Sequence, residues 1–319
     1  MLEVRFPIST FQLQNPASRF HSLLSNKIMI TKKTVVEEID NLTGLKGMVE
    51  TYEEIAASRI KKTRESVLKS RYFMEDLNYI FSEVKSSYRK EIEALMKKNK
   101  IKDKNKLSFF VRNGKTLHVF ISANTGLYGE IVKDTFDLFI EETKKTDCDV
   151  AIIGKQGLSF FLNEKLNKKY VYFDFPDNGM DDAVLKQIIT TLISYEKVVV
   201  FFGKFQSIVT QKPTMSDISG NIESAGEAEE TSMKFFFEPS LERILAFFEQ
   251  EIFSSIFEQT VKESQLAKFA ARIVNLDTST ENIKKRLNQM VYEKNKLVHH
   301  ENNKKQLQVF SSIKLWSLR

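Results

Sequence analysis

The sequence predicts an α/β fold in which a small α/β domain is inserted between two long helices that pair as an antiparallel coiled coil. Three observations lead to this prediction. Nine of the 11 glycines lie between Gly114 and Gly226, so few helix-breaking residues remain on either side. Apolar residues near the C-terminus recur in alternating steps of three and four, which indicates a coiled-coil seam. Between the helical parts, short apolar runs alternate with amphipathic stretches.

Residues 1–28 form a distinct N-terminal arm. Glu3 is the only acid in this segment, which also contains two prolines and several serines. Such a composition is typical of an organellar transit peptide. A flexible arm and a translation start at Met29 are the alternatives.

The N-terminal coiled-coil helix is predicted for residues 29–100, beginning near Thr31, which can cap it. No proline interrupts the chain from there to Pro176. Gly44 and Gly47 weaken this helix by up to about 1 kcal/mol each relative to alanine. They indicate close approach of a neighbouring backbone, a bend, or glycines that are simply tolerated. The apolar positions of the repeat are Val35, Ile39, Leu42, Leu45, Val49, Tyr52, Ile55 and Ala56.

The middle of the chain, residues 101–238, is predicted to be a Rossmann-like α/β domain. A helix between consecutive strands favours parallel pairing. Residues 216–232 carry five acids and no base and are predicted to be an exposed loop, after which "MKFFFEP" is predicted as a last strand. The other strands are expected at 117–122, 150–154, 169–175 and 197–202, and the helices at about 130–145, 156–166 and 181–195.

The C-terminal coiled-coil helix is predicted for residues 239–319. No glycine or proline follows Pro239, and a continuous helix from there would be about 120 Å long at about 1.5 Å per residue. A chain that leaves the α/β domain on one long helix and reaches it on another must pair the two antiparallel. The predicted seam residues are Leu266, Phe269, Ile273, Leu276, Ile283, Leu287 and Met290, with Thr280 in the same register.

Composition excludes several classes of protein. No apolar run approaches the roughly 20 residues of a membrane-spanning helix. The single cysteine, Cys148, excludes internal disulfides and a cysteine-based zinc site. Four histidines are present, and the adjacent pair His299 and His300 would point in different directions on a helix without a carboxylate cluster to complete a metal site. The net charge of +6 permits an acidic partner.

Two loops resemble phosphate-binding loops in part. Gly126 and Gly129 lie between a predicted strand and a predicted helix, but no lysine and hydroxyl pair follows, and Glu130 would repel a phosphate. Gly154 and Gly157 also follow a strand, yet the hydroxyl after Lys155 is missing. Both loops are therefore predicted to be turns.

Five short stretches, in order, resemble the gamma (central shaft) subunit of F-type ATP synthases, over about residues 29–300. They are "IAASRIKK" at 55–62, "ISANTGLYG" at 121–129, "IIGKQGLSFF" at 152–161, "FFGKFQSIVTQKP" at 201–213 and "FFFEPSLERIL" at 235–245. The C-terminal helix also keeps Arg272, Asn282, Leu287, Tyr292, Asn295 and Lys296, with the family's Ser-Glu pair reversed at Glu263 and Ser264.

The resemblance implies a non-catalytic rotor shaft, which couples nucleotide hydrolysis or synthesis in a hexamer of alternating nucleotide-binding subunits to rotation. An epsilon-like subunit and a membrane rotor, or a substitute for it, are the further partners implied. No cofactor is expected in this chain, because ATP, ADP and Mg²⁺ bind to the partner subunits. No nucleic acid is expected as a partner, and membrane association is expected only through the complex. The place implied is the cytoplasmic face of a bacterial membrane, with the mitochondrial matrix side as the alternative.

Partner contacts are expected on two surfaces. The basic cluster of the first helix (Arg59, Lys61, Lys62 and Arg64) is expected to contact acidic loops of the catalytic subunits, with a solvated face as the alternative. The apolar C-terminal end is expected to turn in an apolar bearing, with a frayed tail as the alternative. The remaining predicted contact residues are Arg272, Asn295, Lys296, His299, Leu307, Phe310 and Trp316.

The sequence also departs from the family pattern. Acids at Glu50, Glu53 and Glu54 stand where the family is usually basic. Val298 and His299 stand where the family has arginine and glutamine. These departures favour, as an alternative, the shaft of a specialised F-type-like ATPase, such as one linked to gliding motility in wall-less bacteria. A coiled-coil protein that binds nucleic acid is the alternative of another class, although aromatic residues do not interleave with the basic cluster.

Overall fold

The computed structural model describes residues 32–88, 112–219 and 240–316. The predictions for the N-terminal arm and for the "MKFFFEP" strand lie outside these residues. The chain divides into two compact units, one formed by the segments 1–46 and 283–319 and the other by residues 47–282.

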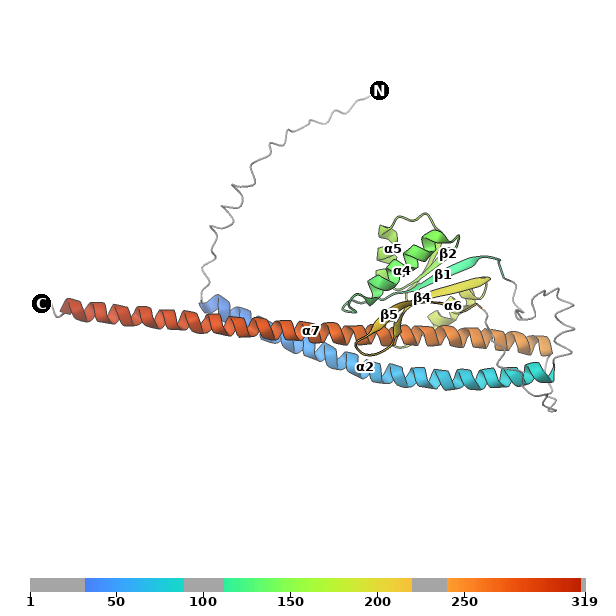
Figure 1. Cartoon of the computed structure of the whole chain (residues 1–319), viewed down its shortest axis with the longest axis horizontal. Coiled ribbons are helices and arrows are strands. Elements are labelled where there is room, and N and C mark those ends of the chain that lie inside the picture. The colour runs from blue at the N-terminus through green and yellow to red at the C-terminus, as the bar shows by residue number, and fades with distance from the viewer. Residues whose placement is uncertain (1–31, 89–111, 220–239, 317–319) are drawn as a thin grey trace, which may run out of the picture. The chain divides into compact units, whose positions relative to one another are not determined.

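Two long helices bracket the α/β part of the chain. Helix α2 extends over Lys32–Ser87 and helix α7 over Leu241–Trp316, so each passes through both units (Figure 1). Neither contains a proline, which explains why both continue without a break. Among the described residues, no helix carries an apolar stretch long enough to cross a membrane.

Antiparallel pairing is visible within the smaller unit. The Nη2 atom of Arg286 on α7 lies 2.9 Å from Oε1 of Glu38 on α2. Farther along, Glu301 lies 3.9 Å from Lys32, so the α7 numbers rise as the α2 numbers fall. These exposed ion pairs contribute about 0–1 kcal/mol each.

The larger unit shows the same pairing over other residues. The rings of Phe81 on α2 and Phe248 on α7 lie 5.6 Å apart. The Nζ atom of Lys262 on α7 donates to Oγ of Ser70 on α2 at 2.6 Å. The buried side chains of this contact are Leu77, Phe81 and Val84 from α2, with Leu245 and Ile252 from α7.

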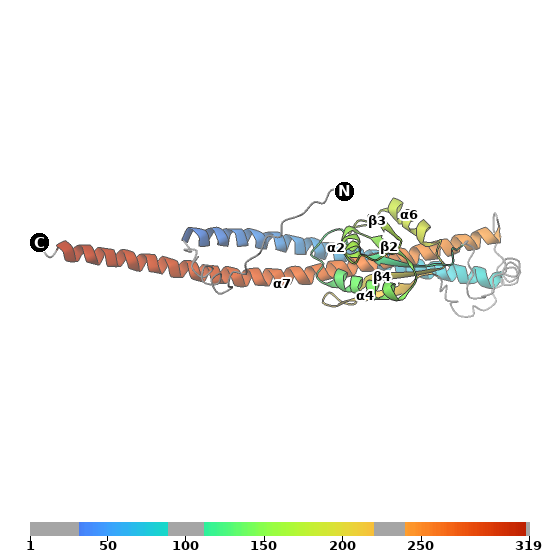
Figure 2. The same cartoon turned by 90° about the horizontal axis from the view of Figure 1, so that it is seen from above.

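A five-stranded sheet in the order β3-β2-β1-β4-β5 forms the centre of the α/β domain. The first four strands pair in parallel, as predicted, and β5 pairs antiparallel with β4. The strands are β1 (Thr116–Ile121), β2 (Asp149–Ile153), β3 (Tyr170–Phe173), β4 (Lys197–Phe205) and β5 (Gln211–Asp217), and the helices are α4 (Ile131–Lys145), α5 (Lys155–Asn163) and α6 (Asp182–Leu192). Figure 2 shows the same elements from above.

Each face of the sheet carries its own buried cluster, because alternate strand residues point to opposite faces. One face packs against α6 and against Phe253, Phe257 and Val261 of α7. The other face packs against α4 and α5, with Phe269 and Ala271 of α7 at its margin. Helix α7 therefore belongs to the core of the α/β domain as well as to the helix pair.

One strand of the sheet differs from the sequence-based expectations. The sequence does not predict strand β5, and its last residues, Ser216 and Asp217, fall in the predicted acidic loop. Its sequence is polar and contains Pro213, which a strand at the edge of a sheet tolerates. Of the alternatives for Gly44 and Gly47, close approach of a neighbouring backbone is not seen: apart from the local helix backbone, no described atom lies within 4 Å of a Cβ placed on either glycine.

Candidate functional site

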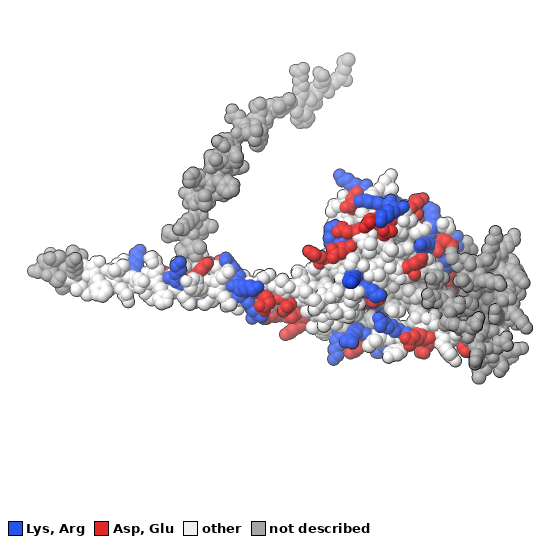
Figure 3. All heavy atoms as spheres, viewed as in Figure 1, with Lys and Arg blue, Asp and Glu red and all other residues white. Residues whose placement is uncertain are grey.

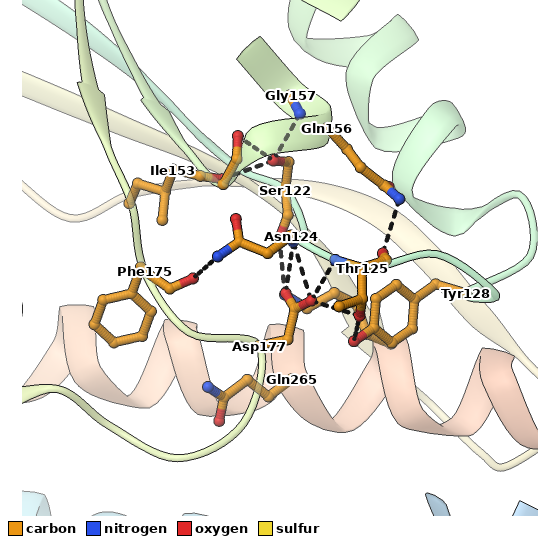
Figure 4. Close-up of polar contacts among 12 residues, drawn as sticks. Ser122, Asn124, Thr125, Tyr128, Ile153, Gln156, Gly157, Phe175, Asp177 and Gln265 are labelled. Carbon is orange, nitrogen blue, oxygen red and sulfur yellow. Dashed lines mark hydrogen bonds and ion pairs between the residues drawn. The ribbon is translucent and has the colours of Figure 1, made fainter. Parts of the chain in front are cut away.

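The loop between β1 and α4 encloses an internal carboxylate. The backbone N–H of Asn124 donates to both carboxylate oxygens of Asp177 at 3.0 Å. The backbone N–H and the hydroxyl of Thr125 donate to Oδ2 of Asp177 at 2.7 and 2.8 Å (Figure 4). The donors that a phosphate loop would offer to an anion are therefore already engaged by the protein itself.

The second glycine-containing loop is engaged in the same way. At the N-terminus of α5, the N–H of Lys155 donates to Oδ1 of Asn124 at 2.8 Å, and the N–H of Gln156 donates to the carbonyl of Ala123 at 2.9 Å. The N–H of Gly157 donates to Oγ of Ser122 at 2.9 Å. Each loop thus supplies the hydrogen-bond acceptors or donors that the other needs, and Figure 4 shows this interlocking.

The carboxylate of Asp177 also faces the C-terminal helix. The Nζ atom of Lys268 lies 3.4 Å from Oδ1 of Asp177 and donates to the carbonyl of Ser122 at 2.7 Å. Both charged side chains are almost completely buried, with 6% of Lys268 and 5% of Asp177 exposed. One turn earlier on α7, Gln265 donates to the carbonyl of Gly179 at 2.8 Å. Two successive turns of α7 are therefore hydrogen-bonded to loops of the α/β domain.

Arg272 extends this contact by one more helical turn. Its Nη2 atom donates to Oγ1 of Thr125 at 3.0 Å and to the carbonyl of Gly126 at 2.7 Å. The guanidinium lies 4.0 Å from the ring centroid of Tyr128, a cation–π contact. We call Ser122, Thr125, Asp177, Lys268 and Arg272 the polar junction.

Charges at the polar junction alter its pKa values. Burial alone would raise the pKa of Asp177, but the Lys268 ammonium and the hydrogen bonds from Asn124 and Thr125 hold it below its usual value. Burial raises the pKa of Tyr128 to about 12, so its hydroxyl stays protonated. Asp177 is therefore a carboxylate at neutral pH, while burial lowers the pKa of Lys268 and the ion pair with Asp177 opposes that shift.

No other cluster in the described part of the chain has the character of a catalytic or metal site. No group of three histidine, cysteine, aspartate or glutamate side chains is placed to hold a metal ion among the described residues. Buried His118 lies 3.0 Å from Oγ1 of Thr143, and burial lowers its pKa to about 4. Burial also raises the pKa of Cys148, which disfavours the reactive thiolate.

The predicted contact residues lie on different parts of the two long helices. All four members of the basic cluster are exposed on α2 and make no ion pair with another described residue. Arg272 is engaged in the polar junction, so its predicted contact with a partner stays a prediction. On α7, Asn295, Lys296, His299, Leu307 and Phe310 are exposed, and Trp316 is the last residue of the helix.

The predicted seam residues all lie on α7. Leu266, Phe269 and Leu276 are buried in the larger unit, and Met290 is buried in the smaller one. Phe269 lies 6.5 Å from the ring of Tyr128, so it packs against the α/β domain. Ile273, Ile283 and Leu287 are half-buried. Their role as a single continuous seam stays a prediction.

Sequence reasoning missed Asp177 and Lys268. A signal for the lysine exists, because "LAKFAAR" places a charge within a run of small and apolar residues, and a buried cation needs a partner. Nothing local identifies that partner, which lies 91 residues away in the sequence.

The visible face of the α/β domain carries no patch in which all charged side chains have the same sign. Basic and acidic side chains are interspersed there (Figure 3). A continuous basic surface, which is the electrostatic mark of a nucleic-acid-binding domain, is absent from this face.

Comparison with known proteins identifies relatives over most of the chain. The family model described as ATP synthase matches residues 31–297. The ATP synthase gamma chain of Ruthia magnifica is 24% identical over 273 residues, covering 80% of this chain and 88% of the relative. That of Mesoplasma florum is 26% identical over 252 residues, covering 77% and 84%. A chain from the central stalk and c-ring of the Tetrahymena thermophila mitochondrial ATP synthase is 16% identical, with a TM-score of 0.49 over 73% of this chain and 99% of that chain.

Fold and site together define a class of protein. Two long paired helices flank an α/β domain along the sequence, and both glycine-containing loops are hydrogen-bonded to the chain's own side chains. The chain belongs to the ATP synthase gamma family, as a non-catalytic shaft subunit.

Proposed function

We propose that this chain turns as the shaft of an F-type rotary ATPase, inside a hexamer of alternating catalytic and non-catalytic nucleotide-binding subunits. The observation that carries the proposal is the extent of the family match, which covers α2, the α/β domain and most of α7. A match limited to the α/β domain would have left the shaft without support.

Coupling follows from the shape of an asymmetric helix pair. As such a pair turns within a ring, it presses differently on each subunit, so nucleotide state and rotational angle become linked. Two packed helices also resist bending better than one, because side chains of each fill the grooves of the other. The described antiparallel contacts in both units support this role.

Two surfaces are proposed to touch the hexamer. The basic cluster is exposed and unpaired among the described residues, so its charge is available to acidic loops of a partner. Near the C-terminus, Leu307 and Phe310 are each 67% exposed, which suits an end that turns within an apolar bearing. Asn295, Lys296, His299 and Trp316 are proposed to line the same end.

An epsilon-like subunit and a membrane rotor, or a substitute for it, are proposed as the remaining partners. The complex is proposed to lie on the cytoplasmic face of a bacterial membrane. Val298 and His299 replace polar groups that the family pattern places near the C-terminus. We therefore propose that the coupling contact at this level relies less on hydrogen bonds than in the family.

Charge reversal of the basic cluster tests the proposal. The variant Arg59→Glu, Lys61→Glu, Lys62→Glu should fold normally, since surface substitutions usually change stability by less than about 0.5 kcal/mol each. It should bind the catalytic hexamer more weakly, or leave ATP hydrolysis uncoupled from rotation. Binding to the hexamer, ATPase rate and rotation are the measurements.

A matched control reverses three exposed lysines of the α/β domain, Lys169→Glu, Lys204→Glu and Lys212→Glu, and so changes the net charge equally. The control should bind the hexamer like the wild type. Equal binding by both variants would show that the basic cluster is a solvated helix face and not a partner contact. If the cluster variant instead lost affinity only for DNA or RNA, with a weaker salt dependence, a nucleic-acid-binding function would replace the shaft.

A further inference from the structure

Helix α7 is held to the α/β domain by two buried ion pairs rather than one. Besides Lys268 with Asp177, Nη2 of Arg112 lies 2.8 Å from Oε1 of Glu249 on α7. Only 15% of the Arg112 side chain and 7% of the Glu249 side chain are exposed. Arg112 also donates from Nη1 to the carbonyls of Ser219 and Glu196 at 2.9 and 3.2 Å. These two residues follow β5 and precede β4, respectively, so Arg112 is bonded to both chain segments that adjoin the β4–β5 hairpin.

The two pairs have opposite polarity. On α7 the first pair uses an acid, Glu249, and the second uses a base, Lys268, while the α/β domain supplies Arg112 and Asp177 respectively. Glu249 and Lys268 are separated by roughly 28 Å along the helix axis, at about 1.5 Å per residue. A helix fixed at two points this far apart can neither slide nor swivel without separating at least one buried pair.

The contact between the two pairs specifies position less strictly. Apart from the hydrogen bond of Gln265, it is made mainly by apolar side chains and by small residues such as Ala267, which is completely buried. A Cβ on Gly203 of β4 would lie 3.6 Å from Cβ of Ala267, so helix and strand are close there. Apolar burial is non-directional, so it specifies the register less strictly than a hydrogen-bonded ion pair does.

Buried ion pairs behave differently from such contacts. Replacing both partners by apolar groups is often neutral for stability, whereas leaving one charge buried without its partner is strongly unfavourable. Displacement of α7 by one turn would separate Lys268 from Asp177 and Glu249 from Arg112. A reversed helix would bring like charges together. The pairs are therefore suited to define a single register.

We propose that Glu249–Arg112 and Lys268–Asp177 together form a two-point clamp that fixes the register of α7 on the α/β domain and passes torque between the shaft and that domain. Arg272 and Gln265 reinforce the second point through Thr125, Gly126 and Gly179. The register is a property of the chain alone. The torque rests on the proposed function as a shaft.

The test removes charges in pairs, so that no buried charge is left alone. One variant carries Lys268→Met with Asp177→Asn, a second carries Arg112→Met with Glu249→Gln, and a third combines all four changes. The matched control, Lys262→Met with Glu258→Gln, removes an ion pair of 2.5 Å within α7, whose lysine bonds to α2 and not to the α/β domain. If the fourfold variant does not fold, the two paired variants carry the test.

Register is measured first, on the full chain by itself. Spin labels at Asp137→Cys on α4 and Asp277→Cys on α7, in a Cys148→Ala background, report the distance between the domain and the helix. The clamp variants should broaden or shift this distance on the scale of one helical turn, about 5.4 Å. The control should give the wild-type distribution. An unchanged, narrow distribution in the fourfold variant would overturn the clamp.

Torque is then measured in the assembled complex, well below the melting temperature of each variant. Clamp variants should hydrolyse ATP at the wild-type rate without load and stall at a lower opposing load than the control. Broadened distances with a wild-type stall load would overturn the torque part of the inference. If the wild-type chain does not join a catalytic hexamer, the proposed function fails instead, and the spin-label result still decides the register.

Discussion

At the scale of single residues, the loops that resemble nucleotide sites form hydrogen bonds to other residues of the same chain. Oxygen atoms of Ser122, Asn124 and Asp177 accept the hydrogen bonds that a phosphate would need. Gly157 is required here because a Cβ would lie 2.5 Å from Oγ of Ser122 and 2.9 Å from Cδ1 of Phe120. Close packing of the two loops, rather than access for a ligand, explains this glycine.

Two glycine-to-alanine substitutions should therefore change stability in opposite directions. Gly157→Ala should destabilise the chain by about 1–3 kcal/mol, because the new methyl group overpacks a buried turn. Gly44→Ala should stabilise it by about 0.5–1 kcal/mol, since the helix gains propensity and no described atom lies near. Urea unfolding of the full chain measures both. If Gly44→Ala were destabilising, this glycine would have to make a close contact that lies outside the described residues.

At the scale of elements, α7 has two structural roles along its length. Part of its length packs against α2, and part belongs to the core of the α/β domain, through residues such as Phe257 and Phe269. It is a single helix over Leu241–Trp316, and both roles need it to be unbroken.

Leu276→Pro should abolish assembly or activity of the complex. Proline removes a backbone donor and clashes with the preceding turn, which costs about 3 kcal/mol or more in a helix interior. Leu276 is also buried, with 3% exposed. Assembly and ATPase rate are the measurements, and Leu276→Met, which conserves volume and backbone, is the control. Normal assembly by the proline variant would show that α7 does not act as one continuous rod.

At the scale of the whole molecule, the chain is a member of the ATP synthase gamma family. The backbone donors of its two glycine-containing loops are hydrogen-bonded to the chain's own side chains. Neither glycine loop is a complete phosphate-binding loop, in keeping with a non-catalytic subunit. Val298 and His299 lie on α7, outside the α/β domain, and their contact with a partner subunit stays a prediction.

The isolated chain is expected neither to bind nor to hydrolyse ATP. Its candidate loop donors are satisfied by Asp177 and Asn124, so an incoming phosphate would have to displace a buried carboxylate. Calorimetric titration with ATP and Mg²⁺ should give no heat of binding at micromolar concentrations, with a catalytic subunit as the positive control. Micromolar affinity in the isolated chain would contradict the description of both loops as turns.

Much of the fold follows from local signals in the sequence. Placement of glycine and proline, the heptad rhythm and strand-length apolar runs were enough to predict two long helices and four parallel strands. Strand β5 escaped prediction because a polar edge strand owes its structure to β4 rather than to its own apolar pattern. The five family motifs were likewise readable, because each is a short stretch of neighbouring residues.

By itself, then, the sequence determined the two long helices, the four parallel strands with the helices between them, the absence of a complete phosphate loop and the family. Only the tertiary structure decided which side chains fill the two loops and how α7 is fastened to the α/β domain. The physical reason is distance along the chain. Lys268 meets Asp177 across 91 residues and Arg112 meets Glu249 across 137, so neither pair leaves a periodic or local trace. Such pairs exist only once the sheet order has brought their loops to the same helix.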